Sequence, residues 1–514
     1  MQSRDRLIPA GLGLLAFLAV LTTLGHPGIT IDEPLDVRPG RTYVQALGKQ
    51  GLRFFGPASV RAVFADNAEH PPLGRWLLGI ASVLGEPFEG YLGGADPYGV
   101  HAGRLAPAAS FGLLVGLVAG SALRHGGRVA GIGAGLALIL MPRMFAHAHF
   151  AALDTFVALF WVAAFLSADR AIGSRNPGPM MALAGIVWAL ALLTKIHGWL
   201  LPPLVGLYGL ARLGPKRAIL PFGLWLTVGL AIFIAGWPWL WYEAGTRLRA
   251  YLATGTDRIA LHTLYFGKIF DDRDVPWHYP WFYFATTVPV GLHLFGIFGL
   301  GWALKLRHGW GLRLAGGILM FLILFSTRIP VYDGERLFLA AFPLWAMLIG
   351  LGLAWLWDLA NRRWLRAGII ILVAGQGYGV VALHPFGLSY YNALVGGLPG
   401  AERLGLELTF WSDAIDATLL DELARVASPG DVTSVVPTLH HIQPGSMMTA
   451  KLLERRIRLE PQEARDRARW LLISRRTAYW PGGMAEELEG RRPIGLRSRQ
   501  GVWLSGIWPG PEMN

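Results

Sequence analysis

Long apolar runs separated by short polar connections fill about the first three quarters of the chain. A transmembrane helix needs about 20 mainly apolar residues, within a range of roughly 17 to 25. Runs near this length predict about eleven transmembrane helices, several of them short. The runs cover residues 7–24, 105–123, 129–141, 149–168, 180–194, 197–213, 218–240, 281–304, 314–327, 337–357 and 367–383. The shorter apolar stretch 76–84 predicts an interfacial or re-entrant helix instead.

The basic residues of the short connections follow an alternating pattern. If the amino terminus is cytoplasmic, the cytoplasmic connections are rich in Lys and Arg and the opposite ones are poor in them, as the positive-inside rule requires. The rich set is Arg124, Arg128, Arg170, Arg175, Arg212, Lys216, Arg217, Lys305, Arg307, Arg313, Arg362, Arg363 and Arg366, and the poor set is Arg143, Lys195, Arg328 and Arg336. We therefore predict a multi-pass protein of the cell (inner or plasma) membrane with a cytoplasmic amino terminus. The first helix is expected to be retained rather than cleaved as a signal peptide, because no convincing small-residue cleavage site precedes Asp32.

The same topology places the long polar segments on the extracytoplasmic side. They are two loops, at residues 25–104 and 241–280, and the whole carboxy-terminal segment from residue 384. That last segment is charged and has no apolar run long enough to span a bilayer. Its patterns predict helices at 413–426 and 461–468 and strands at 432–436, 470–473 and 502–507. We therefore expect a transmembrane module over 1–383 and a small extracytoplasmic α/β domain over 384–514.

Composition supports a chain built for lipid. Of the 514 residues, 53% are hydrophobic and only 16% are charged, and the mean hydropathy is +0.41, whereas soluble domains are about a quarter charged. The net charge of +12 lies in the short connections, so we attribute it to orientation and lipid-headgroup contact and expect no nucleic-acid partner. The chain has no cysteine, which excludes disulfides and Cys-ligated metal.

Two groups of acids follow the first apolar run on the predicted outer side. Asp32 and Glu33 come directly after it and ahead of a proline, at the depth where a membrane gives way to water. Glu69 and His70 precede two prolines that stiffen the backbone and fix where these side chains point. A solvated acidic pair and a loop turn are the plain alternatives. We predict that Asp32 is a general base.

Cations stand at the same predicted membrane edge. Arg104, Arg143, Lys195 and Arg336 each lie beside an apolar run. The guanidinium fork suits phosphate, although an arginine that only snorkels to the interface is common. Asp154 lies inside an apolar run, where an unpaired charge is costly, so we expect it to pair with Arg143, Lys195 or Arg104.

The remaining candidates are histidines and aromatic residues. His147 and His149 do not favour a metal site, because residues two apart on a helix face different ways. His278 and Tyr279 lie in an aromatic-rich outer loop that suits either an interface belt or a wall against which a sugar stacks.

Taken together, these residues resemble the bacterial branch of the protein O-mannosyltransferase family, within the GT-C superfamily of polyprenyl-phosphate-sugar glycosyltransferases. The likeness covers about residues 29–392. It differs at residues 407–413, where the family often has a sequence of the type Asn-Leu-Asp-Trp-Gly-Gln, and at Leu337, where an aromatic residue is usual. The motifs that carry it are Asp32-Glu33, His70-Pro71-Pro72-Leu73-Gly74, Arg104 before a proline, Leu153-Asp154, Thr194-Lys195, Pro276-Trp277-His278-Tyr279, Gly334-Glu335-Arg336 and Ser389-Tyr390-Tyr391-Asn392.

The resemblance implies a mainly α polytopic GT-C fold and an inverting transfer of sugar from a polyprenyl-phosphate donor on the extracytoplasmic side. Asp32 would be the base and Glu33 would position it or the acceptor. The remaining roles are phosphate binding by Arg104, Lys195 and Arg336, then His70 and Arg143, and support by Glu69, Asp154, His278 and Tyr279. No cofactor is required, and a divalent cation, used in other GT-C branches, is not favoured.

The acceptor is left open between a protein hydroxyl and an envelope glycan or lipid. Transfer of an aminoarabinose type to lipid A is the main alternative within the class. A membrane transporter is the alternative of another class, but transporters tend to hold ionisable residues near the membrane centre within paired repeats. Here the acids gather at one edge and no repeat is apparent. A non-catalytic scaffold with an envelope-binding outer domain is the third alternative.

Overall fold

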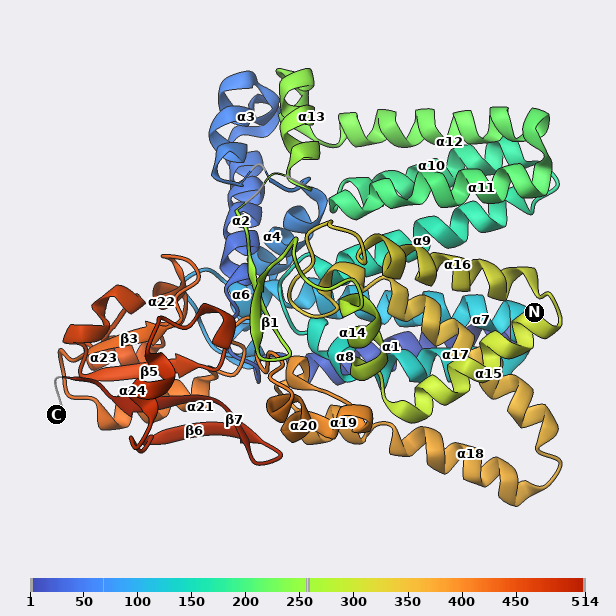
Figure 1. The fold of residues 1–514 in the computed structure, drawn as a ribbon. Helices are drawn as coiled ribbons and strands as arrows, with labels where there is room; N and C mark the ends of the chain where they lie inside the picture. Colours follow the sequence, from blue (N-terminus) through green and yellow to red (C-terminus); the bar gives the residue numbers. More distant parts are fainter. Residues whose placement is uncertain (1–2, 68, 256, 258, 512–514) are drawn as a thin grey trace.

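The computed structural model describes residues 3–67, 69–255, 257 and 259–511. Most of the chain forms a helical bundle, and a carboxy-terminal sheet domain lies beyond one end of it (Figure 1). The amino terminus lies at the opposite end of the bundle (Figure 1). The helices of the bundle are α1 (Leu7–Leu21), α7 (Leu105–Ile139), α9 (Asp154–Ile172), α10 (Pro177–Leu192), α11 (Leu201–Leu213), α12 (Pro215–Ala235), α15 (Val290–Lys305), α16 (Gly309–Leu324), α17 (Ala341–Leu359) and α18 (Arg363–Gly375).

Helix α7 is two helices joined at a glycine. Gly127 has φ 78° and ψ −171°, a backbone conformation that favours glycine because any Cβ would be strained. A Cβ added at Gly131 would lie 2.8 Å from the Cβ of Leu123, and one at Gly135 would lie 3.2 Å from the Cβ of Ala119. The two halves therefore fold back on each other as a hairpin, as the separate runs 105–123 and 129–141 predict.

Each predicted apolar run overlaps at least one of the observed helices. Within the described residues, five helices are long and apolar enough to cross a membrane, and a pair bent by 111° makes a sixth if it is one span. Shorter apolar helices are α1, α10 and α16. These features support a multi-pass membrane protein, while the number of about eleven spans stays a prediction. The five are Val100–Ile139, Asp154–Ile172, Pro215–Ala235, Ala341–Leu359 and Arg363–Leu383, and the bent pair is α14 (Tyr279–Thr287) with α15.

Small residues let the central helix α17 approach its neighbours closely. A Cβ at Gly350 would lie 2.3 Å from the carbonyl oxygen of Ala130 in α7, and one at Gly352 would lie 1.9 Å from that of Phe295 in α15. Backbone contacts of this kind through small residues are typical of helices packed in membranes. These contacts hold α7, α15 and α17 together in the bundle.

The longer segments between the bundle helices lie at the end of the bundle that faces the sheet domain (Figure 1). Helices α2 and α4 pack backbone to backbone, since a Cβ at Gly79 would lie 2.1 Å from the carbonyl oxygen of Gly40. The short helix predicted at 76–84 is confirmed as part of α4. These elements are α2 (Asp32–Gln50), α3 (Pro57–Phe64), α4 (Leu73–Gly85), α5 (Glu89–Leu92), α6 (Val100–Gly103), α8 (Pro142–His147), α13 (Ala244–Ala253), the hairpin β1 (His262–Tyr265) with β2 (Lys268–Asp271), α14, and α19 (Tyr378–Leu383).

The carboxy-terminal domain contains a mixed sheet of five strands in the order β4-β3-β5-β7-β6. Strand β3 pairs in parallel with β4 and β5, and β7 pairs antiparallel with β5 and β6. The small sheet predicted here is confirmed, although the helix expected from residue 413 begins at Ala417. The elements are α20 (Gly397–Arg403), α21 (Ala417–Val426), β3 (Val432–Val436), α22 (Gln443–Ser446), α23 (Ala450–Glu454), β4 (Arg458–Glu460), β5 (Trp470–Ser474), α24 (Met484–Leu488), β6 (Gly495–Arg499) and β7 (Val502–Pro509).

Candidate active site

A cavity of about 890 Å³ opens where the bundle, the segments at its end and the sheet domain meet. Its polar part is lined by side chains from α2, from the segment before α4 and from the turn before α17. Its apolar lining includes residues at the ends of bundle helices, such as Leu200, Leu324 and Phe325. The sequence-predicted residues that line it are Asp32, Glu69, His70, Lys195 and Arg336.

Arg336 is the centre of the polar part. Its guanidinium donates to Asp32, to the Oδ2 of Asp154 at 3.1 Å and to the Oδ2 of Asp333 at 3.2 Å. Its other face lies over the ring of Trp411, with 4.5 Å between the guanidinium carbon and the ring centroid. Bonds to charged partners are the stronger class of hydrogen bond, so the three carboxylates hold this cation in one orientation.

Lys195 supplies a second cation beside Arg336. It lies between the end of α10 and a 3-10 turn, Ile196–Leu200, and its backbone is extended there. Its ammonium group donates to the Oδ1 of Asp154 at 3.0 Å. Asp154 thus pairs with Lys195, one of the partners expected for it, and also with Arg336. Arg143 and Arg104, the other expected partners, are engaged elsewhere.

Asp36 is a cavity residue that the sequence reasoning missed. It lies one turn after Asp32 on α2, and it accepts a hydrogen bond from the Nε of Arg75 at 3.0 Å. Burial raises the pKa of Asp36 to about 6, the Arg75 guanidinium opposes this change, and the charge of Asp32 adds to it. The spacing of Asp32 and Asp36 is a signal that was available, because residues four apart share a helix face.

Glu69 and His70 line the cavity as expected. Burial lowers the pKa of the His70 imidazole well below its usual value, and the nearby Lys195 and Arg75 add to the effect. His70 is therefore a neutral imidazole near pH 7, which can donate or accept a hydrogen bond but brings no positive charge for a phosphate.

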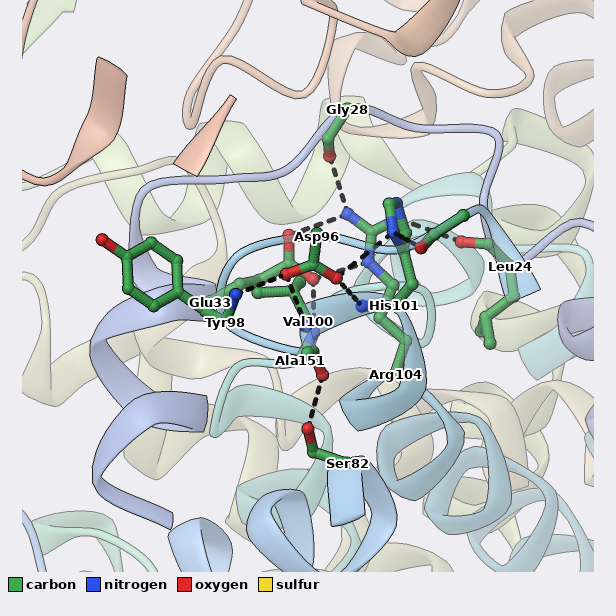
Figure 2. A network of polar contacts seen from close by, with 12 residues as sticks. Leu24, Gly28, Glu33, Ser82, Asp96, Tyr98, Val100, His101, Arg104 and Ala151 are labelled. Atoms are coloured by element: carbon green, nitrogen blue, oxygen red, sulfur yellow. Dashed lines mark hydrogen bonds and ion pairs between the residues drawn. The ribbon is translucent and has the colours of Figure 1, made fainter. Parts of the chain in front are cut away.

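Glu33 and Arg104, by contrast, form a buried pair with each other (Figure 2). Arg104 donates to both Glu33 oxygens, at 2.7 and 2.8 Å, and to the carbonyl oxygens of Leu24, Pro27 and Gly28. Glu33 also accepts from the backbone nitrogen of Ala151 at 2.7 Å.

Neither member of this pair is found among the described residues that line the cavity. The phosphate role expected of Arg104 and the positioning role expected of Glu33 are therefore not what this geometry favours. The pair instead ties the loop after α1 to the segments before α7 and α9. An arginine at a membrane edge, three residues before a proline, gives no sequence signal that separates the two uses.

Arg143 lies behind the site in the same way. Its guanidinium donates to Glu335 at 2.6 Å and to the carbonyl oxygen of Tyr390 at 3.0 Å, and it lies over the ring of Tyr391. It is not among the described cavity-lining residues. Because Glu335 precedes Arg336, Arg143 supports the turn that carries Arg336 rather than facing the cavity.

The two supporting residues of the second outer loop differ in position. The hydroxyl of Tyr279 accepts from the backbone nitrogen of Gly334 at 2.9 Å, so Tyr279 also holds the turn before Arg336. The Nδ1 of His278 lies 2.7 Å from the hydroxyl of Tyr265 in β1. Neither is found among the described residues that line the cavity.

The sheet domain closes the cavity with residues that no local pattern indicated. Trp411, His440, Arg476 and Tyr479 all line it. Arg476 donates to the Oδ1 of Asp333 at 2.5 Å. Four cations, Arg75, Lys195, Arg336 and Arg476, thus face four carboxylates, Asp32, Asp36, Asp154 and Asp333, in one polar cluster.

In the described part of the chain, no group of three or more His, Asp or Glu residues is arranged to hold a metal ion. The acids that converge on the cavity share the guanidinium of Arg336. The cations of the site therefore suit an anionic ligand. The expectation that no cofactor is required stays a prediction.

A sequence model of the family described as dolichyl-phosphate-mannose-protein mannosyltransferase matches residues 65–247, a segment that contains Asp154 and Lys195. A search of curated proteins finds no match.

Two solved structures of ArnT from Cupriavidus metallidurans share the fold. The apo structure has 17% sequence identity and a TM-score of 0.53, with 96% of this chain and 97% of that chain covered. The structure bound to undecaprenyl phosphate has 16% identity and a TM-score of 0.52, with 99% and 98% covered. The chain therefore has the fold of these ArnT structures over nearly its whole length, and its residues 65–247 match the model of the protein mannosyltransferase family.

Proposed function

We propose that the protein transfers a sugar from a polyprenyl-phosphate donor to a hydroxyl acceptor, with inversion at the anomeric carbon and Asp32 as the base. The observation that carries this proposal is that one cavity has both an apolar lining and a cationic, polar lining. Apolar side chains at the ends of bundle helices suit a lipid chain, and in the same cavity Lys195 and Arg336 present positive charge.

The cations act on the leaving group. As the bond between the anomeric carbon and the phosphate oxygen breaks, the electron pair stays on the phosphate, and the added charge needs preorganised donors. Arg336 is held in place by three carboxylates and Lys195 by one, so both are oriented before the donor arrives. The undecaprenyl phosphate in one structure with this fold fits the same chemistry.

Asp32 takes the proton of the acceptor hydroxyl as its oxygen attacks the anomeric carbon. Its side chain is 25% exposed, whereas those of Asp154 and Asp333 are 4% and 6% exposed. Of the three acids around Arg336, Asp32 is therefore the one that an acceptor reaches most easily. A carboxylate in this position can take up the proton as a general base.

Two classes of acceptor are candidates. A protein hydroxyl is the first candidate, because residues 65–247 match the protein mannosyltransferase family. An envelope lipid or glycan, including an aminoarabinose-type transfer to lipid A, is the second candidate. We place the reaction on the extracytoplasmic side of the inner or plasma membrane, with about eleven spans and a cytoplasmic amino terminus.

Labelled donors test the proposal. The purified protein in liposomes is given polyprenyl-phosphate-linked mannose or aminoarabinose together with a hydroxyl peptide, lipid A or buffer alone. We expect acceptor-dependent release of polyprenyl phosphate that persists in a chelator of divalent cations. Movement of intact donor or sugar across the membrane without cleavage would support a transporter and overturn the proposal.

A further inference from the structure

Asp333 connects the sheet domain to the centre of the site. Its Oδ1 accepts from the Nη2 of Arg476 at 2.5 Å, and its Oδ2 accepts from the Nε1 of Trp411 at 2.8 Å and from Arg336 at 3.2 Å. Asp333 and Arg476 are both buried, with side chains 6% and 4% exposed. One carboxylate of the bundle is thus shared between Arg336 and two residues of the carboxy-terminal domain.

The turn that contains Asp333 needs such support. Asp333 has φ 56° and Gly334 has φ 67°, so two consecutive residues lie in the left-handed region. This region is strained for a residue with a side chain, although Asp tolerates it better than most. The turn leads into Arg336, whose guanidinium donates to Asp32.

Arg476 is itself fixed by the sheet domain. It lies two residues after β5 and directly before a 3-10 turn, Thr477–Tyr479. The Glu407 carboxylate accepts from the backbone nitrogens of Thr477 and Ala478, at 2.9 and 3.1 Å. The guanidinium carbon of Arg476 also lies over the rings of Phe410 and Tyr479, 5.5 and 5.1 Å from their centroids. The position of Arg476 therefore reports that of the docked sheet domain.

We propose that Arg476 and Trp411 are positioning residues that orient Arg336 toward the donor phosphate through Asp333, so that the carboxy-terminal domain completes the active site. Without Arg476, the buried charge of Asp333 has Arg336 as its remaining cationic partner. Asp333 then competes with Asp32 and Asp154 for that guanidinium and draws it out of place. Misplacement of a catalytic group by about 1 Å costs about 100-fold in rate.

The test uses a matched pair of neighbouring arginines. Arg475 pairs with Glu402 at 2.5 Å and is not among the described residues that line the cavity. We expect Arg476→Gln to lower kcat about 10- to 100-fold and to raise the donor KM, while Arg475→Gln keeps both within about threefold of wild type. Trp411→Phe, which keeps a ring beside Arg336 but loses the donor to Asp333, is expected to lose less than Arg476→Gln.

A double variant shows whether Arg476→Gln acts by misplacing Arg336 or by disturbing the fold. Asp333→Asn removes the competing charge, so Arg476→Gln combined with Asp333→Asn is expected to be more active than Arg476→Gln alone. Wild-type kinetics in Arg476→Gln, equal losses in the Arg475 and Arg476 variants, or simple additivity in the double variant would overturn the proposal.

The inference rests on the proposed function for its kinetic readout, and a second readout keeps the two apart. If the wild-type protein transfers no sugar, the proposed function fails, but thermal stabilisation by polyprenyl phosphate still tests the positioning. We then expect the wild type and Arg475→Gln to be stabilised alike and Arg476→Gln to be stabilised less. Equal stabilisation of all three proteins would overturn the positioning role alone.

Discussion

Replacement of Arg336 by lysine tests whether the shape of the guanidinium matters as well as its charge. In the structure, three nitrogens of Arg336 point to three different carboxylates, and the flat face lies over Trp411. A lysine keeps one positive charge but presents all its donors from a single atom. It cannot serve the same three acceptors and stack on the ring at once.

The loss follows from the contacts that Arg336→Lys removes. At least one hydrogen bond to a charged group disappears, which is worth about 1.5–3 kcal/mol. The interaction with the Trp411 ring weakens as well, and such contacts contribute about 0.5–1 kcal/mol or more. Together they amount to about 2–4 kcal/mol, which corresponds to a fall of about 30- to 1,000-fold in kcat/KM for the donor.

Steady-state transfer from a labelled polyprenyl-phosphate sugar measures this loss. Arg328→Lys is the control, because Arg328 is exposed, lies in the same connection and borders a separate small cavity. We expect the control to match the wild type. A kcat/KM for Arg336→Lys within about threefold of wild type would refute the reasoning, because charge alone would then suffice.

Further variants test other parts of the account. Lys195→Met removes the second cation beside Asp154, so the Kd for the donor, measured by titration, is expected to rise about 10- to 100-fold. Glu33→Gln leaves Arg104 buried without its counter-charge, so thermal unfolding is expected to show a loss of about 3–5 kcal/mol with little change in donor Kd. Burial raises the pKa of Asp413 from 3.8 to about 7. Between these two pH values the folded protein therefore holds a proton that the unfolded chain has released. The free energy of unfolding is expected to fall as the pH rises through this range, by about 4 kcal/mol in all. Asp413→Asn is expected to remove this fall, and its unfolding temperature should exceed that of wild type at pH 8 but not at pH 4.

The apolar helices of the bundle could be predicted from the sequence, because a helix that crosses a bilayer needs a long apolar run. The hairpin in α7 shows this well, since Gly126 and Gly127 divide two apolar runs in the sequence and turn the chain in the structure. Strands β3 (Val-Thr-Ser-Val-Val) and β5 (Trp-Leu-Leu-Ile-Ser) could be predicted from the sequence because both are short runs rich in apolar and β-branched residues.

The site was only partly readable. The position of Asp32, Lys195 and Arg336 at the edges of apolar runs predicts a shared site, and the structure brings all three to one cavity. Arg104 also lies at the edge of an apolar run, but the structure pairs it with Glu33. A position at the edge of an apolar run indicates how deep a charged residue lies in the membrane, but not in which direction its side chain points. Arg476 lies far from the bundle in sequence and reaches the site only by domain docking, for which the sequence has no local pattern.

The most direct measurement of the central claim is the single-turnover rate of sugar transfer in Asp32→Asn, with Asp66→Asn as the control. Asp66 is an exposed acid of the same loop, paired with Arg38 at 2.7 Å and not among the described cavity-lining residues. A general base contributes about 100- to 10,000-fold, so we predict that Asp32→Asn loses at least about 100-fold in rate while it still binds the donor and the control keeps the wild-type rate. A rate for Asp32→Asn within about threefold of wild type would contradict the account.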